Sequence, residues 1–128
     1  MLVNLLSLFL ILLPSVTFTH ETTIRAATVK EEQNVFNAFK ERLIEPDLAS
    51  ISNLRVSANG NAICGFFSIK NKAGQYIQRD DVFYVMVLTR DIGEPIYAVT
   101  DIDYGNNTEA ATRCEEEGIA PIKSASQR

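Results

Sequence analysis

The chain has 128 residues, a length that allows one domain with a small hydrophobic core. Hydrophobic residues make up 46% of it and charged residues 22%, which is typical of a folded globular domain and excludes a disordered one. The net charge is −4 and the twelve Lys and Arg residues are scattered singly, so the chain lacks the basic surface that nucleic-acid binding needs.

The first segment has the features of a signal peptide. Residues 2–13 form an apolar run with two polar interruptions, and Pro14 ends it. The run is shorter than the roughly 20 apolar residues that cross a bilayer as a helix. We expect residues 1–19 to be removed on export, with a boundary as late as residue 27, which gives a periplasmic or secreted protein. An uncleaved anchor and a cytosolic protein remain alternatives, because no Lys or Arg precedes Arg25.

The two cysteines are predicted to form a disulfide. In an exported small domain an even number of cysteines indicates a bridge, so Cys64 pairs with Cys114. Two buried free thiols are the alternative. A catalytic cysteine needs a base, and the only histidine, His20, lies in or beside the leader. The sequence therefore argues against a Cys-His enzyme.

A helix is predicted from residue 27 to residue 45. Thr28 and Glu31 have the spacing of a capping box at its start, and Pro46 cannot continue it. An apolar stripe at helical spacing gives it one face that covers a core. The stripe consists of Val29, Phe36, Phe39 and Leu43, with Val35 and Ile44 beside it.

About four antiparallel strands are predicted next. Residues 54–58 and 62–70 flank Asn59-Gly60, which is typical of a hairpin with a type I′ turn. On the second strand, Cys64, Phe66 and Ser68 share one face, and Ile63, Gly65, Phe67 and Ile69 share the other.

A turn at Gly74 leads into residues 82–88, which are apolar on both faces and indicate a central strand. Residues 96–103 form the last strand. Its expected inward side chains are Ile96, Ala98 and Ile102, and its outward ones are Tyr97, Val99, Asp101 and Asp103.

A short helix is predicted to close the domain. Asn107 and Thr108 cap it, it runs through Glu117, and Gly118 ends it. The prediction is an α+β domain over residues 28–122, in which a helix packs on an antiparallel meander and the disulfide ties the second helix to the sheet. Residues 123–128 form a flexible tail.

The middle of the chain resembles a region shared by small exported bacterial envelope proteins and lipoproteins. In that region a helix ending in a D-P-x-S-A-like segment precedes a strand and C-G-x-V-N-x-K-N-x-x-G-G-Y. The resemblance covers about a third of the chain. It implies an envelope location and a hairpin, and it brings no catalytic residues. The matching residues are Cys64, Gly65, Lys70, Asn71, Gly74 and Tyr76, while Glu45, Leu48, Ser68 and Gln75 approximate the pattern or depart from it.

One carboxylate pair is a candidate for chemistry. Asp101 and Asp103 project from the same face of a strand, as acid–base or metal chemistry requires. The segment DIDYGNN begins like a calcium loop, but its glycine is one place early and Thr112 stands where a Glu is needed. We interpret the pair as a solvated strand end and predict neither a metal nor a cofactor.

The candidate binding surface comprises the segment 71–81 and a sheet face that the four tyrosines, at 76, 84, 97 and 104, would share. Two alternatives remain: the charged residues 79–81 serve only to prevent association of the apolar strand that follows them, and the tyrosines are covered in a core. We expect a non-catalytic binding protein acting on a protein or envelope component, with membrane contact only if the leader is uncleaved. A small carboxylate-based or metal-dependent hydrolase and a membrane-anchored structural protein are the other hypotheses. The candidate residues are Tyr76, Arg79, Asp80, Asp81 and Tyr97.

Overall fold

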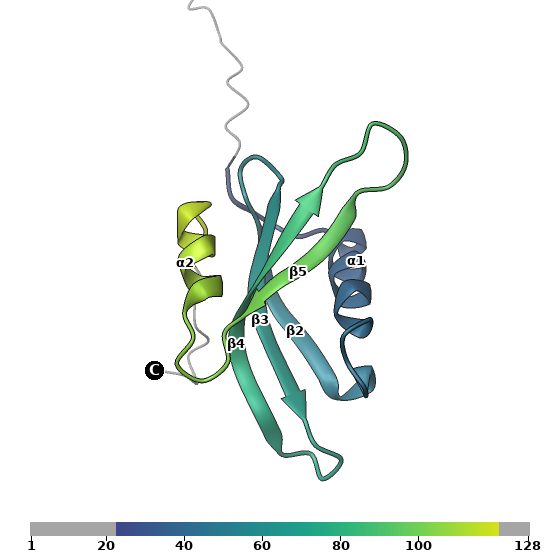
Figure 1. Ribbon diagram of the computed structural model, residues 1–128, viewed down its shortest axis with the longest axis vertical. Coiled ribbons are helices and arrows are strands. Elements are labelled where there is room, and N and C mark those ends of the chain that lie inside the picture. The colour runs from purple at the N-terminus through teal and green to yellow at the C-terminus, as the bar shows by residue number, and fades with distance from the viewer. Residues whose placement is uncertain (1–22, 121–128) are drawn as a thin grey trace, which may run out of the picture.

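A computed structural model describes residues 23–120, in which an antiparallel sheet lies between two helices (Figure 1). The predicted leader and the tail at 123–128 lie outside these residues. The α+β meander is confirmed, with five strands instead of four because a two-residue strand precedes the first helix. The strands, in their order across the sheet, are β1 (Arg25–Ala26), β2 (Ala49–Val56), β3 (Ala62–Lys70), β4 (Tyr76–Leu88) and β5 (Ile96–Ile102).

The first helix, α1 (Val29–Lys40), begins as predicted and ends early. Thr28 Oγ1 accepts a hydrogen bond from the Glu31 N–H at 3.1 Å, and Glu31 Oε1 accepts one from the Thr28 N–H at 3.0 Å. The predicted end at residue 45 is wrong, since the chain uses residues 41–48 to turn back into β2, including the 3₁₀ turn η1 (Pro46–Leu48). As a result Ile44 leaves the helical stripe and is 99% exposed.

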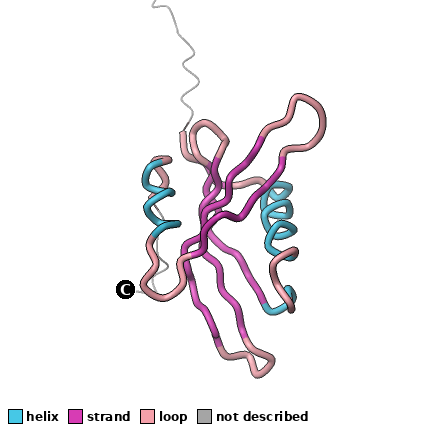
Figure 2. Tube along the Cα trace, viewed as in Figure 1, coloured by secondary structure: helices cyan, strands magenta, loops and turns pink. Residues whose placement is uncertain are grey.

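One helix lies on each face of the sheet, α1 on one and α2 (Glu109–Glu116) on the other (Figure 2). Each face has its own core beneath its helix. On the α1 side, the Phe39 ring stacks on Phe67 with centroids 5.0 Å apart and meets Phe83 edge-on at 4.9 Å. The predicted two-sided burial of 82–88 is confirmed except at Met86, which is half-buried, and at Leu88, which is exposed. The α1 core contains Val35, Phe39, Leu54, Val56, Ile63, Phe67, Phe83, Val85, Val87 and Val99. The α2 core contains Ala62, Cys64, Phe66, Val82, Tyr84, Ala110, Cys114 and Ile119.

The β2–β3 turn differs from the predicted type I′ turn. Gly60 has a φ of 76°, but Asn59 is not among the residues with positive φ. The Gly60 N–H instead bonds Ser57 O at 2.9 Å, and the Ser57 N–H bonds Ala62 O at 2.8 Å. The loop is therefore longer than two residues, and only Gly60 needs the left-handed region.

The predicted facing of β5 is wrong in its first half. The register with β4 shifts between Tyr84 and Val85, and Thr100 is left without a partner in the ladder. This bulge reverses which side chains of β5 face the α1 core. Tyr97 and Val99, which were expected to point outward, face that core.

The second helix, α2 (Glu109–Glu116), is fastened to the sheet by the predicted disulfide between Cys64 and Cys114. Gly118, with a φ of 76°, ends the helix region as predicted. The predicted cap is confirmed for Asn107, whose Oδ1 accepts from the Glu109 N–H at 3.0 Å, and is wrong for Thr108, whose side chain makes no capping bond. The carboxylate of Asp103, one residue after β5, accepts from the next two N–H groups of the helix, as described below.

Candidate binding surface

The end of the β3–β4 hairpin extends past both helices (Figure 1). Asn71 closes its turn, with Oδ1 accepting from the Gln75 N–H at 3.0 Å and its own N–H donating to Gln75 O at 2.8 Å. Gly74 has a φ of 80°, so the predicted turn glycine is confirmed. Residues from Tyr76 onward belong to β4, so the predicted surface segment is mostly strand.

Tyr76 lies between two cations at this end of the hairpin. Lys70 Nζ is 4.7 Å from its ring centroid, and the Arg79 guanidinium carbon is 4.9 Å away. Tyr76 is 47% exposed and the neighbouring Ile77 is 65% exposed. Contacts of this kind hold the side chains in place by about 0.5–1 kcal/mol each at exposed sites. The structure thus brings the predicted residues Tyr76 and Arg79 together on one surface.

The predicted residue Asp80 supports the shape of the hairpin, and Asp81 follows it on β4. Asp80 has a φ of 51° in a β-bulge, where Ser68 Oγ accepts from the Asp80 N–H at 2.8 Å and donates to Asp80 Oδ1 at 3.3 Å. Partial burial raises the pKa of Asp81, and the carboxylates of Asp103 and Asp80 raise it further. A bulge increases the local twist, which turns the hairpin end away from the rest of the sheet.

The four tyrosines do not share a face. Tyr84 is buried beneath α2 and donates a hydrogen bond to Glu117 Oε1 at 3.3 Å, and burial raises its pKa. Tyr97 packs on the opposite side against the α1 core. It lines a cleft of about 470 Å³ between α1 and the β4–β5 loop. The fifth predicted residue, Tyr97, is therefore separated from the Tyr76 surface.

The carboxylate pair at the end of β5, Asp101 on the strand and Asp103 just after it, is engaged within the fold. Asp103 is buried, and its two oxygens accept from the N–H groups of Ala110 at 2.8 Å and Ala111 at 3.0 Å, at the start of α2. Asp101 Oδ2 accepts from Thr100 at 2.9 Å and lies 3.3 Å from Arg113 Nε. The expectation of a solvated strand end is thus wrong for Asp103, which caps a helix.

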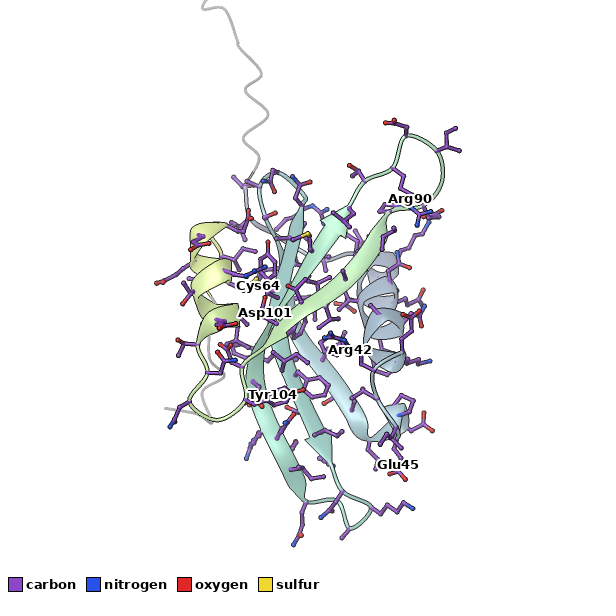
Figure 3. The ribbon with its side chains drawn as sticks, viewed as in Figure 1. Arg42, Glu45, Cys64, Arg90, Asp101 and Tyr104 are labelled. Carbon is purple, nitrogen blue, oxygen red and sulfur yellow. A yellow bond between two sulfur atoms is a disulfide. The ribbon has the colours of Figure 1, made fainter. Side chains whose placement is uncertain are left out.

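A groove adjoins the hairpin end on the α1 side, between the α1–β2 connection and the strands. Its volume is about 510 Å³. Sequence reasoning missed this groove, because the helix was predicted to reach residue 45 with Ile44 beside its apolar stripe. Pro46 restricts only the residue before it, Glu45, so no local signal marked the earlier end of the helix. Figure 3 shows Arg42 and Glu45 on this connection. The apolar lining consists of Leu43, Ile44, Leu48, Ile69 and Ile77.

Within residues 23–120, no three His, Cys, Asp or Glu side chains are grouped so as to hold a metal ion. Neither helix in this part of the chain has the length and apolar character needed to span a bilayer. The chain matches no family model, no curated protein and no solved structure.

Proposed function

We propose that the chain is a small exported, non-catalytic binding protein of the bacterial envelope. It docks onto a protein or another envelope component through the end of its β3–β4 hairpin. The observation that carries the proposal is the exposed pair Tyr76 and Ile77, with Lys70 and Arg79 held over the Tyr76 ring. Tyr and Arg are enriched where proteins bind one another, and an ordered side chain loses little entropy on docking.

Export is supported by the buried disulfide. Cys64 and Cys114 are 1% and 0% exposed, and they join the sheet to α2 across a separation of 50 residues. Bridges of this kind persist in oxidising compartments and are rare in the cytosol of mesophiles. The apolar run at residues 2–13 is in keeping with the same route.

A binding role is favoured over hydrolysis by the partners of the β5 carboxylates. Asp103 has both oxygens committed to the N-terminus of α2, and Asp101 is paired with Arg113. A general acid or nucleophile needs a carboxylate that reaches a substrate. On the hairpin, by contrast, Tyr76 and Ile77 are 47% and 65% exposed and so present their side chains to a partner.

Site-specific photocrosslinking in the native host tests the proposal. A photoreactive amino acid replaces Ile77, and in a matched control it replaces Ile92, an 89% exposed isoleucine on the β4–β5 loop. We expect a light-dependent adduct of defined mass from position 77 that position 92 does not give. Adding Tyr76→Ala and Arg79→Ala should abolish it. The same adducts from both positions, or none from either, would contradict the proposal.

A further inference from the structure

We propose that the groove beside the hairpin binds an extended acidic peptide segment that carries an apolar anchor residue. This inference rests on the proposed function and names the chemistry of the partner. The anchor would contact the floor of the groove, formed by Leu43, Leu48 and Ile69, which pack partly into the fold. Ile44 and Ile77, which are exposed, would cover it from the sides.

The charges around the groove select an anionic partner. Three cations line it, Arg42, Lys70 and Lys72, against one carboxylate, Glu45. Lys72 Nζ lies 3.4 Å from Glu45 Oε1, with the two side chains 83% and 47% exposed, so this pair is weak. In the described part of the chain, no ion pair engages Arg42 or Lys70. The groove is thus locally positive on a chain whose net charge is −4.

The shape of the groove favours a peptide over a flat surface. A hollow of about 510 Å³ admits side chains, whereas a bilayer surface would rest on its rim without filling it. The groove is open to solvent, so an extended chain can lie across it with alternate side chains pointing inward. Carboxylates that flank the anchor would then meet Arg42, whose planar guanidinium binds a carboxylate through two parallel hydrogen bonds.

The groove is distinct from the cleft on the other side of α1. That cleft is lined by Lys30 and Arg90 but also by Glu41 and Glu94, and Lys30 already pairs with Glu94 at 3.5 Å. Its charges balance, so it offers no preference for an anion. Figure 3 shows Arg90 on the β4–β5 loop, away from Arg42. Arg90 therefore supplies a matched control for a charge change at Arg42.

The test measures binding of a fluorescent peptide of alternating Glu and Leu to the purified mature protein by anisotropy. Arg42→Glu should weaken binding by about tenfold or more, because a rim charge in contact with the ligand is reversed. Arg90→Glu, which changes the net charge equally, should leave binding within about twofold. Ile77→Ser should also weaken it, and peptides with Lys for Glu, or Ser for Leu, should not bind.

Four outcomes would overturn the inference. An equal loss of peptide affinity in Arg42→Glu and Arg90→Glu would show that the peptide is held only by long-range electrostatic attraction to the protein. Undiminished binding of the Ser-substituted peptide would show that no anchor is seated. Binding to vesicles of anionic phospholipid but not to the peptide would assign the surface to a membrane. An adduct at Ile77 in the host without peptide binding would leave the proposed function standing while this inference fails.

Discussion

The Asp103 carboxylate accepts a hydrogen bond from the Ala110 N–H at 2.8 Å, and this contact fastens the end of β5 to the start of α2. The Ala111 N–H bonds the second oxygen at 3.0 Å. The negative charge also complements the positive end of the helix dipole. The helix therefore obtains its cap from Asp103, which precedes Ala110 by seven residues, together with Asn107, whose Oδ1 accepts from the Glu109 N–H, and its own Thr108 side chain takes no part.

Replacing Asp103 by Ala should lower the free energy of unfolding by about 1–2 kcal/mol, because two helix N–H groups lose their acceptor. Asp101→Ala should cost less, at most about 1 kcal/mol, because its partner Arg113 is 47% exposed. Urea denaturation of both variants measures the difference. Equal losses would contradict the assignment of Asp103 as the cap.

Some features of the fold follow from local chemistry and were predictable from the sequence. The capping box at Thr28 and Glu31 involves neighbours in the chain, so its spacing alone reveals it. The apolar run at 82–88 of β4 was predictable because a strand that is covered on both faces needs apolar side chains on both. The disulfide was predictable because only two cysteines exist to pair.

Other features depend on contacts that no local pattern specifies. The bulge at Thr100 shifts the alternation of β5, and its position is fixed by the pairing with β4. The early end of α1 depends on where the chain must turn to enter β2. The groove arises from the early end of α1 and from the bulged β3–β4 hairpin, since it is walled by the 41–48 connection on one side and by that hairpin on the other. Of the candidate binding residues, Tyr76 and Arg79 are found together, and Arg79 Nε also lies 3.9 Å from Asp80 Oδ2, whereas Tyr97 packs against the α1 core.

Gly65 marks a close approach of a ring to the backbone. A Cβ at this position would lie 2.8 Å from Ser52 O and 2.9 Å from the Phe83 ring. Gly65→Ala should therefore destabilise the domain by about 1–3 kcal/mol, as overpacking does. In a Phe83→Leu background the same substitution should cost less, because part of the clash is removed. Identical costs in the two backgrounds, measured by chemical denaturation, would refute the contact as the cause.

Removing the disulfide should cost about 4 kcal/mol, since the bridge restricts a loop of 50 residues in the unfolded chain. The variant carrying Cys64→Ala and Cys114→Ala measures this without leaving buried thiols. A reductant should lower the denaturation midpoint of the parent protein and leave that of the variant unchanged. A parent protein indifferent to complete reduction would show that the bridge contributes nothing to stability.

Glu31 should make the stability depend on pH in acid. Its hydrogen bond with Arg25, helped by those from Thr28, lowers the pKa of Glu31 from 4.5 to about 2. The folded state thus stabilises the ionised form of Glu31 relative to the unfolded chain. The resulting stability is present above pH 4.5 and is lost as the pH falls through about 2.

Glu31→Gln should lower the stability at neutral pH by about 1 kcal/mol and flatten its decline in this acid range. Glu32→Gln, which removes one negative charge at the next residue, is the control and should keep the decline of stability in acid. Urea titrations at a series of pH values provide the measurement. A Glu31→Gln variant with an unchanged pH profile would assign the effect to other groups.

The most direct test of the account is mass spectrometry of the chain recovered from fractions of its native host. Ile24 packs against the α2 core and Arg25–Ala26 pairs with β2, so a mature protein should keep these residues. We predict an envelope or external protein that begins upstream of Ile24, with Cys64 and Cys114 joined. A full-length chain in the cytosol with two free thiols would contradict the account.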